Sequence, residues 1–371
     1  MVNKVNWKHL AGLIVLLTAL GCSSKDSNEK APEKSVETET GETAKTDETK
    51  AQNTAEVKAE KVGGPVVIYS GRSEVLVSPL LEMFTKKTGI EVEVRYEKSS
   101  EGLANRIATE GKETPVDVFF AQDSGYLGAL GQKEHLKKLP SDLLEQVEEK
   151  YRDEAGTWLP TSGRARVLVY SPDRVKPEEL PKTLLELTDE RFRKRLGWAP
   201  GNGSFQAHVS ALRSVWGDEK TKKWLADIKS LEPTTYPKNG AQVRAVSNGE
   251  IDMGWVNHYY LHKIRANNPE LKAANHSFPT QGDAGNVMML SGAGISTHTD
   301  NYANAEKFLR FLVSPEAQEF FAQKVYEYPT KPGVKTHEEV PPLTESIVRV
   351  DQAALTDVGP TLNMLRELGL Q

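Results

Sequence analysis

The sequence predicts an α/β fold of two lobes with a ligand cleft between them. From Pro65 to Gln371 the chain has about 300 residues, close to the size at which a single hydrophobic core divides in two. Two series of strands and helices alternate along this part, and polar residues follow the strand ends in each series. This alternation predicts parallel sheets joined by right-handed crossovers.

The first series begins with a buried strand, because Val66–Ser70 is a short apolar run. A helix is expected next, since leucines and a phenylalanine recur at helical spacing over Val75–Thr88 and Gly89 then ends the pattern. The elements expected in this series are strand 66–70, helix 75–88, strand 90–96, helix 103–111 and strand 117–120.

The second series has the same alternation and its own polar turns. The elements expected are strand 166–170, apolar segment 196–200, helix 205–216, helix 242–249 and strand 251–256. In such sheets ligands bind outside the carboxyl ends of the strands. These ends are Ser70–Ser73 and Ala121–Asp123 in the first series, and Gly201–Ser204 and Asn257–Tyr260 in the second. The sequence therefore predicts that ligand groups of both lobes face one cleft.

Tyr259 and Tyr260 directly follow the last expected strand. Neighbours within a strand point to opposite faces, but in a turn or at a helix start both phenols can converge on one point. Two phenolate oxygens suit a hard cation, and deprotonating two phenols requires a large local charge such as that of a trivalent metal. The alternative is ordinary packing, with one ring inside and the other exposed.

The turn Gly201–Ser204 at a helix start also has two interpretations. Its free amide N–H groups would form an anion site, or the turn is a plain N-cap. No Lys-Ser or Lys-Thr follows the glycines, so a nucleotide-hydrolysing phosphate loop is not supported.

Binding and release is a better functional class for this chain than catalysis. The folded part has no Gly-x-Ser-x-Gly elbow, no His-Glu-x-x-His motif and no cysteine nucleophile. His258 and His262 have a spacing that can clamp a transition metal, but no third His or Cys lies nearby, which favours a structural role. A hydrophobic content of 38% and a formal charge of −5 are typical neither of a membrane-embedded protein nor of one that binds nucleic acid.

The first residues are typical of export. Lys4 and Lys8 precede the apolar run Ala11–Leu20, which is too short to span a bilayer, and Cys22 follows as the only cysteine of the chain. This order resembles the bacterial lipoprotein signal, which implies a signal peptide over 1–22 and lipid modification of Cys22.

The segment 23–64 contains no aromatic residue and is rich in Glu, Lys, Thr, Ala and Ser. A chain of this composition cannot bury enough apolar surface to order itself. We therefore expect a disordered acidic and polar tether between the lipid and the folded domain.

An exported, tethered, two-lobed α/β protein with ligand groups at its strand ends resembles the solute-binding proteins of ABC importers. The resemblance implies a type II periplasmic-binding-protein fold with a hinged cleft. Several blocks are similar to the ferric-iron-binding branch: Ile68–Glu74, Pro115–Gln122, Ser162–Tyr170, Tyr236–Asn239, Asn248–Asp252, Val256–Tyr260 and Glu327–Pro329. The most specific is Asn-x-Tyr-Tyr after Asn-Gly-Glu-Ile-Asp.

The resemblance implies a role for each residue that matches the motifs of the family. The paired tyrosine ligands of the metal fall on Tyr259 and Tyr260. The residues that hold a synergistic anion fall on Asn202, Gly203, Ser204, Asn239 and Asn257. A basic residue near metal and anion falls on Arg164, with Arg166 as a second candidate.

Three departures from the family pattern change the expected ligand set. Ser73 stands where the best-known members have a histidine, Gln122 where they have a glutamate, and Phe205 where other branches have a further tyrosine. Ferric iron held by two phenolates would keep a net positive charge and open coordination positions. A carbonate, phosphate or citrate-like anion or water would fill them, while Gln122 could donate a carbonyl oxygen and Ser73 a hydroxyl.

The sequence therefore predicts a monomeric, lipid-anchored protein of the periplasm or cell surface that captures ferric iron with an anion and delivers it to the membrane subunits of an ABC permease. The first lobe would comprise 65–163 and about 288–340, and the second 164–287 and about 341–371. One alternative is a binder of a phosphorylated sugar, a phosphonate or another organic anion on the same fold, which would not require the tyrosine pair. Another is a structural lipoprotein without a ligand.

Overall fold

The computed structural model describes residues 63–97, 100–343, 347–348, 350, 355 and 358–371, which belong to one compact unit, 59–371. The expected signal peptide, Cys22 and nearly all of the expected tether lie outside the described residues. Within the described part, no helix is long and apolar enough to cross a membrane.

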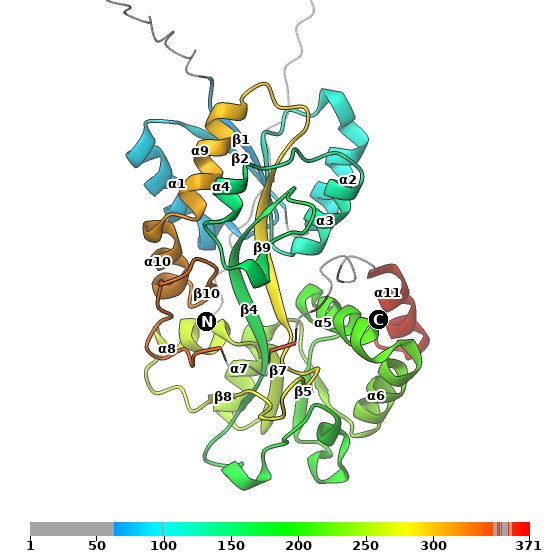
Figure 1. Ribbon diagram of the computed structural model, residues 1–371. Coiled ribbons are helices and arrows are strands. Elements are labelled where there is room, and N and C mark those ends of the chain that lie inside the picture. Colours follow the sequence, from blue (N-terminus) through cyan, green and yellow to red (C-terminus); the bar gives the residue numbers. More distant parts are fainter. Residues whose placement is uncertain (1–62, 98–99, 344–346, 349, 351–354, 356–357) are drawn as a thin grey trace, which may run out of the picture. The chain divides into compact units, whose positions relative to one another are not determined.

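One sheet of ten described strands runs through this unit (Figure 1), in the order β2-β1-β3-β9-β4-β7-β5-β6, with β8 and β10 both paired to β4. The strands are β1 (Val66–Ser70), β2 (Val92–Tyr96), β3 (Val118–Ala121), β4 (Leu159–Tyr170), β5 (Leu196–Trp198), β6 (Thr234–Thr235), β7 (Met253–Asn257), β8 (Ala274–His276), β9 (Met288–Ile295) and β10 (Tyr328–Pro329). The helices are α1 (Glu74–Thr88), α2 (Ser100–Glu110), α3 (Ser124–Gln132), α4 (Ser141–Leu144), α5 (Gly203–Trp216), α6 (Asp218–Ser230), α7 (Asn239–Asn248), α8 (Tyr259–Arg265), α9 (Tyr302–Leu312), α10 (Pro315–Lys324) and α11 (Val358–Glu367).

The parallel pairing expected from the sequence occurs at both ends of the sheet. β1 pairs in parallel with β2 and β3, and β5 pairs in parallel with β6 and β7. The middle of the sheet is antiparallel, which the sequence pattern did not predict. The first half of β4 pairs with β9 and its last five residues pair with β7, so these long strands join the two parallel halves.

Helices cover both faces of each half of the sheet, and strand side chains alternate between them. In one half, Ile68 and Phe120 pack against residues of α1, α9 and α10, whereas Phe119 packs against residues of α2 and α3. In the other half, Trp255 packs against residues of α5, α6 and α11, and Val256 packs against residues of α7 and α8. Each half of the sheet has its own hydrophobic clusters on both faces, which confirms the two-lobed α/β class.

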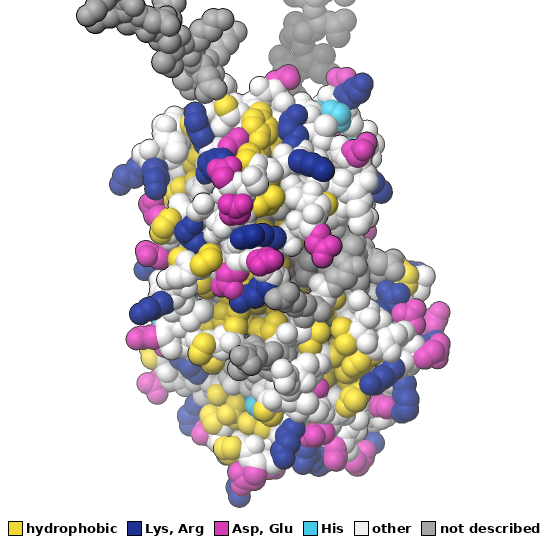
Figure 2. Space-filling model, viewed as in Figure 1, with side chains coloured by type: hydrophobic (Ala, Val, Ile, Leu, Met, Phe, Trp, Pro, Cys, Tyr) yellow, Lys and Arg dark blue, Asp and Glu magenta, His cyan; other side chains and the backbone are white. Residues whose placement is uncertain are grey.

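The charged side chains on the face shown in Figure 2 are of mixed sign, with Lys and Arg interspersed among Asp and Glu. A nucleic-acid-binding surface has basic residues clustered on one face. The face in Figure 2 lacks such a cluster, which agrees with the formal charge of −5.

Candidate metal and anion site

A cavity of about 690 Å³ opens at the carboxyl ends of β1, β3 and β7. The residues from the predicted site that line it are Ser73, Gln122, Arg164, Asn202, Gly203, Ser204, Asn257, Tyr259 and Tyr260. Asn239 is not among the lining residues, but its Nδ2 donates to Ser204 Oγ at 2.9 Å. Loops from both halves of the sheet therefore reach one cavity, as expected for ligand sites in α/β sheets.

The tyrosine pair stands on the first turn of a helix, because β7 ends at Asn257 and α8 begins at Tyr259. The two rings are stacked, with centroids 4.4 Å apart and planes 26° apart, and both line the cavity. Tyr259 is buried and Tyr260 is half-buried. Burial, and next the neighbouring Tyr260, raise the pKa of Tyr259 well above its usual value. The Tyr259 phenol is therefore neutral at physiological pH unless a strongly charged cation displaces its proton.

Arg164 is fully buried in the wall of the cavity. Its Nη2 donates to Asp123 Oδ1 at 2.9 Å and to the main-chain carbonyl oxygen of Gln122. Among the described residues, its Nε and Nη1 have no hydrogen-bond partner. A buried guanidinium with unused N–H groups is suited to bind an oxyanion, since charge-assisted hydrogen bonds to such anions are strong.

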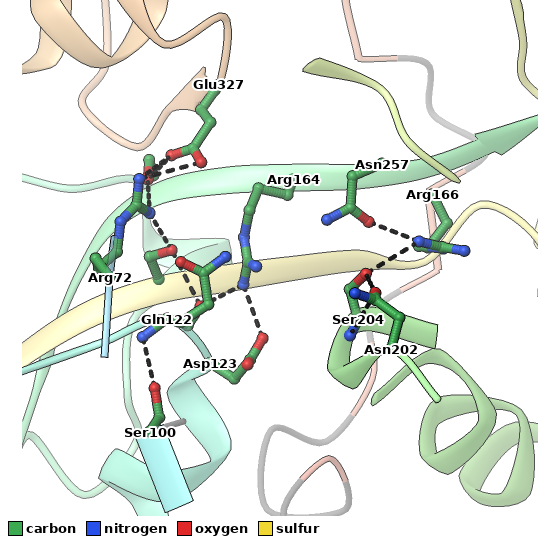
Figure 3. Close-up of polar contacts among 12 residues, drawn as sticks. Arg72, Ser100, Gln122, Asp123, Arg164, Arg166, Asn202, Ser204, Asn257 and Glu327 are labelled. Atoms are coloured by element: carbon green, nitrogen blue, oxygen red, sulfur yellow. Dashed lines mark hydrogen bonds and ion pairs between the residues drawn. The ribbon is translucent and has the colours of Figure 1, made fainter. Parts of the chain in front are cut away.

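The second candidate, Arg166, does not line the cavity. Its Nη1 donates to Asn257 Oδ1 at 3.0 Å, to Asn239 Oδ1 at 3.3 Å and to Ser204 Oγ at 3.4 Å, as Figure 3 shows for Asn257 and Ser204. Three of the five residues that are expected to hold an anion are therefore joined to one another by a buried guanidinium.

The turn before α5 is an N-cap. Asn202 Oδ1 accepts the N–H of Ser204 at 3.2 Å and the Ser204 hydroxyl at 2.6 Å. The Ser204 amide is thus occupied by a side chain of the protein itself, so the N-cap interpretation describes the structure. An anion role for Asn202, Gly203 and Ser204 remains a prediction.

Sequence reasoning missed a buried ion pair beside the cavity. Arg72 Nη2 lies 3.0 Å from Glu327 Oε2, and both side chains are fully buried. Ser162 on β4 donates to the same carboxylate at 2.5 Å, and Arg72 also donates to Ser291 on β9. The pair therefore ties the loop after β1 to both strands that join the halves of the sheet. Both charged residues lie in blocks that carry the family resemblance, which was the available signal.

Four acidic residues also line the cavity and were not predicted: Glu74, Glu97, Glu101 and Asp123. Within the described part of the chain, no group of three or more His, Cys, Asp or Glu side chains is arranged to hold a metal.

The two histidines beside the tyrosines are not part of the cavity wall. His258 Nδ1 accepts the N–H of Ala165 on β4 at 3.1 Å, and its Nε2 donates to the carbonyl of Tyr326 at 2.7 Å. Burial lowers the pKa of His258 to about 4, so the neutral ring that makes both bonds is the stable form at neutral pH. His262 Nδ1 lies 3.4 Å from Glu339 Oε2. His258 thus fixes the start of α8 to β4.

A two-lobed α/β fold with a polar cavity at the strand ends defines the class of the protein. The model of the bacterial extracellular solute-binding protein family matches residues 69–319. The chain belongs to this family, and its relatives are solute-binding transport proteins rather than enzymes.

Several relatives and solved structures similar to this chain are iron-binding proteins, and another relative is the thiamine-binding periplasmic protein of Salmonella typhimurium, 25% identical over 237 residues, which cover 61% of this chain and 68% of that protein. The Fe(3+)-binding periplasmic protein of Serratia marcescens is 30% identical over 310 residues, which cover 82% of this chain and 90% of that protein. Iron-bound HitA from Pseudomonas aeruginosa has a TM-score of 0.77 at 29% identity, covering 83% of this chain and 100% of that one. The Trichodesmium protein (IdiA, FutA) in complex with iron and citrate has a TM-score of 0.72 at 26% identity, with coverage of 83% and 100%.

Proposed function

We propose that this protein captures ferric iron together with a small anion and delivers it to the membrane subunits of an ABC permease. The observation that carries the proposal is the stacked pair Tyr259 and Tyr260, which lines the same cavity as Arg164, a buried arginine with two nitrogens that have no partner among the described residues. The ferric-iron proteins among the relatives support the choice of metal.

The charges of the expected ligands explain why an anion is part of the proposal. Two phenolates neutralise only part of the charge of ferric iron, and hard oxygen ligands are preferred for the remaining positions. Carbonate, phosphate or a citrate-like anion would occupy them, held by Arg164, Asn239, Asn257 and Ser204. Gln122 and Ser73 would add a neutral carbonyl and a hydroxyl, since both line the cavity. The complex of the Trichodesmium relative with iron and citrate supports an anion of this kind.

A titration of the wild-type apoprotein with ferric iron tests the function. Visible absorbance is followed with carbonate, phosphate or citrate present, and the apparent affinity should depend on the anion supplied. Burial raises the pKa of Tyr259, so iron must displace its proton at every pH up to that pKa, and affinity should fall as pH falls. If no iron binds with any of the anions, while a phosphorylated sugar or phosphonate binds by calorimetry, the organic-anion alternative is the better account.

We also propose that the protein is held at the membrane by lipid on Cys22, which lies outside the described residues. The order of features at the start of the sequence supports this proposal: charged residues come first, then an apolar run, and then the cysteine. The variant Cys22→Ala should appear in the released fraction of cells that retain the wild type in the membrane fraction. Membrane retention of Cys22→Ala with unchanged processing would rule out the anchor.

The proposed lobes are 65–163 with about 288–340, and 164–287 with about 341–371, and the proposed state is a monomer. β4 and β9, which join the two halves of the sheet, are the natural place for a hinge. Solution scattering should give the mass of one chain and a smaller radius after loading. Equal radii before and after confirmed loading would contradict hinge closure.

A further inference from the structure

Arg166 differs from the other two buried arginines around the cavity in having no carboxylate partner among the described residues. Arg72 pairs with Glu327, and Arg164 pairs with Asp123. Arg166 instead donates to neutral oxygens, including the carbonyl of Trp255 at 2.8 Å, and lies over the Trp255 ring, 5.3 Å from its centroid. A buried charge of this kind lowers the free energy of unfolding, because its desolvation is not offset by a counter-ion. Its presence beside the cavity therefore points to a functional role.

The charge of Arg166 persists at neutral pH. Burial lowers its pKa to about 9, while the nearby Tyr260 and Tyr259 act in the opposite direction. The guanidinium is therefore a fixed set of donors, with no capacity to accept a hydrogen bond.

A donor-only group dictates the orientation of the amides beside it. An asparagine that faces a guanidinium must present its oxygen, since its NH₂ group would meet another donor. Asn257 accordingly turns Oδ1 to Arg166, and its amide nitrogen points away from Arg166 (Figure 3). Asn257 lines the cavity and Arg166 does not, so the cavity receives the amide hydrogens.

The neighbouring side chains prevent this orientation from reversing. Asn239 also turns Oδ1 to Arg166, and its Nδ2 donates to Ser204 Oγ at 2.9 Å. The Ser204 hydroxyl in turn donates to Asn202 Oδ1 at 2.6 Å. The hydrogen-bond directions of Asn239, Ser204 and Asn202 therefore follow from the guanidinium of Arg166.

We propose that Arg166 is a positioning residue of the anion site, which strengthens oxyanion binding by holding the N–H groups of Asn257 toward the cavity. Asn257 lines the cavity together with Arg164, whose Nε and Nη1 have no hydrogen-bond partner among the described residues. An oxyanion such as sulfate or phosphate offers acceptor oxygens to these donors. The inference rests on the proposed function for the location of the anion, but it concerns the anion alone and is tested without iron.

The experiment is calorimetric titration of the apoprotein with sulfate and with inorganic phosphate at neutral pH. Wild type should bind both anions. Arg166→Lys keeps the charge but cannot reach three oxygens, so the affinity for each anion should fall on the order of tenfold, as for loss of a charge-assisted hydrogen bond.

Arg174→Lys is the matched control, since Arg174 bonds Asp252 and two main-chain carbonyls away from the cavity. It should leave both affinities unchanged.

A double-mutant cycle separates positioning from a structural role. If Arg166 acts through Asn257, then Arg166→Lys should change sulfate affinity little in an Asn257→Ala background. Additive effects, an unchanged sulfate affinity in Arg166→Lys, or no binding of either anion to wild type would overturn the proposal. Should Arg166→Lys fail to fold, Arg166→Met serves in the same cycle, because it leaves no carboxylate unpaired. If the protein binds no ferric iron, the proposed function is wrong, but the results on anion binding remain valid.

Discussion

The double replacement Tyr259→Phe/Tyr260→Phe is expected to abolish ferric-iron binding and to leave the fold intact. Both phenyl rings can keep the stacked position, in which the centroids lie 4.4 Å apart, because only the hydroxyl oxygens are lost. The iron then has no anionic protein ligand from this pair, and no cluster of acidic or histidine side chains among the described residues can replace it. Replacing a residue that only supports a metal ligand lowers metal affinity by up to about 100-fold. Because the two tyrosines are proposed to be ligands themselves, the affinity for iron should fall by more than this.

Equilibrium titration with ferric iron and citrate, followed in the visible range, measures this effect. The matched control is Tyr170→Phe/Tyr236→Phe, which removes two hydroxyls of the same half of the sheet that are not in the cavity wall. The control should bind iron like wild type. Iron binding by the Tyr259/Tyr260 variant at wild-type strength would refute the assigned role of the pair.

Replacing Glu327 by glutamine is expected to produce the largest loss of stability among single changes near the cavity. Arg72 would remain fully buried without a counter-ion, because the new side chain offers only one neutral amide oxygen in place of the carboxylate that now accepts through both oxygens. Breaking one partner of a buried pair costs about 3–5 kcal/mol in the free energy of unfolding. Because the pair contacts both β4 and β9, the loss should also weaken the join between the two halves of the sheet.

Urea unfolding at neutral pH measures the effect, with Glu316→Gln as the control. Glu316 pairs with Lys87 at 2.8 Å on the surface, where such pairs contribute about 0–1 kcal/mol. The paired replacement Arg72→Met/Glu327→Met should recover much of the stability lost in Glu327→Gln, since it leaves no charge buried alone. Equal losses in Glu327→Gln and Glu316→Gln would show that the buried pair is not structurally important.

Local patterns in the sequence predicted elements of the two series up to β7 and the strand ends at the cavity, but not the later helices α9, α10 and α11. The helical spacing of apolar residues over 75–88 predicted α1, and the position of Tyr259 and Tyr260 after an apolar strand predicted their place at a strand end. Within each half of the sheet the carboxyl ends of the parallel strands meet at one edge, and the two lobes were expected to turn these edges toward one cleft, which is why residues as distant as Gln122 and Ser204 could be assigned to one cavity.

Long-range pairing was beyond those patterns. Arg72 and Glu327 are 255 positions apart, and no periodicity connects them. The antiparallel place of β9 between β3 and β4 depends on where the chain returns, which a strand pattern does not encode. The contacts of Arg166 with three polar side chains were also invisible, because hydrogen-bond partners are set by the packed fold. The sequence consequently left the anion role of the turn before α5 undecided, and the capping bond from Asn202 appeared only in the structure.

The most direct test of the central claim is metal analysis combined with the visible spectrum of the wild-type protein after loading with ferric iron and citrate. Binding by Tyr259 and Tyr260 predicts one iron per chain and a phenolate-to-iron charge-transfer band that disappears when the iron is removed. A colourless protein without iron, or a protein that retains iron without this band, would contradict ferric binding by the tyrosine pair.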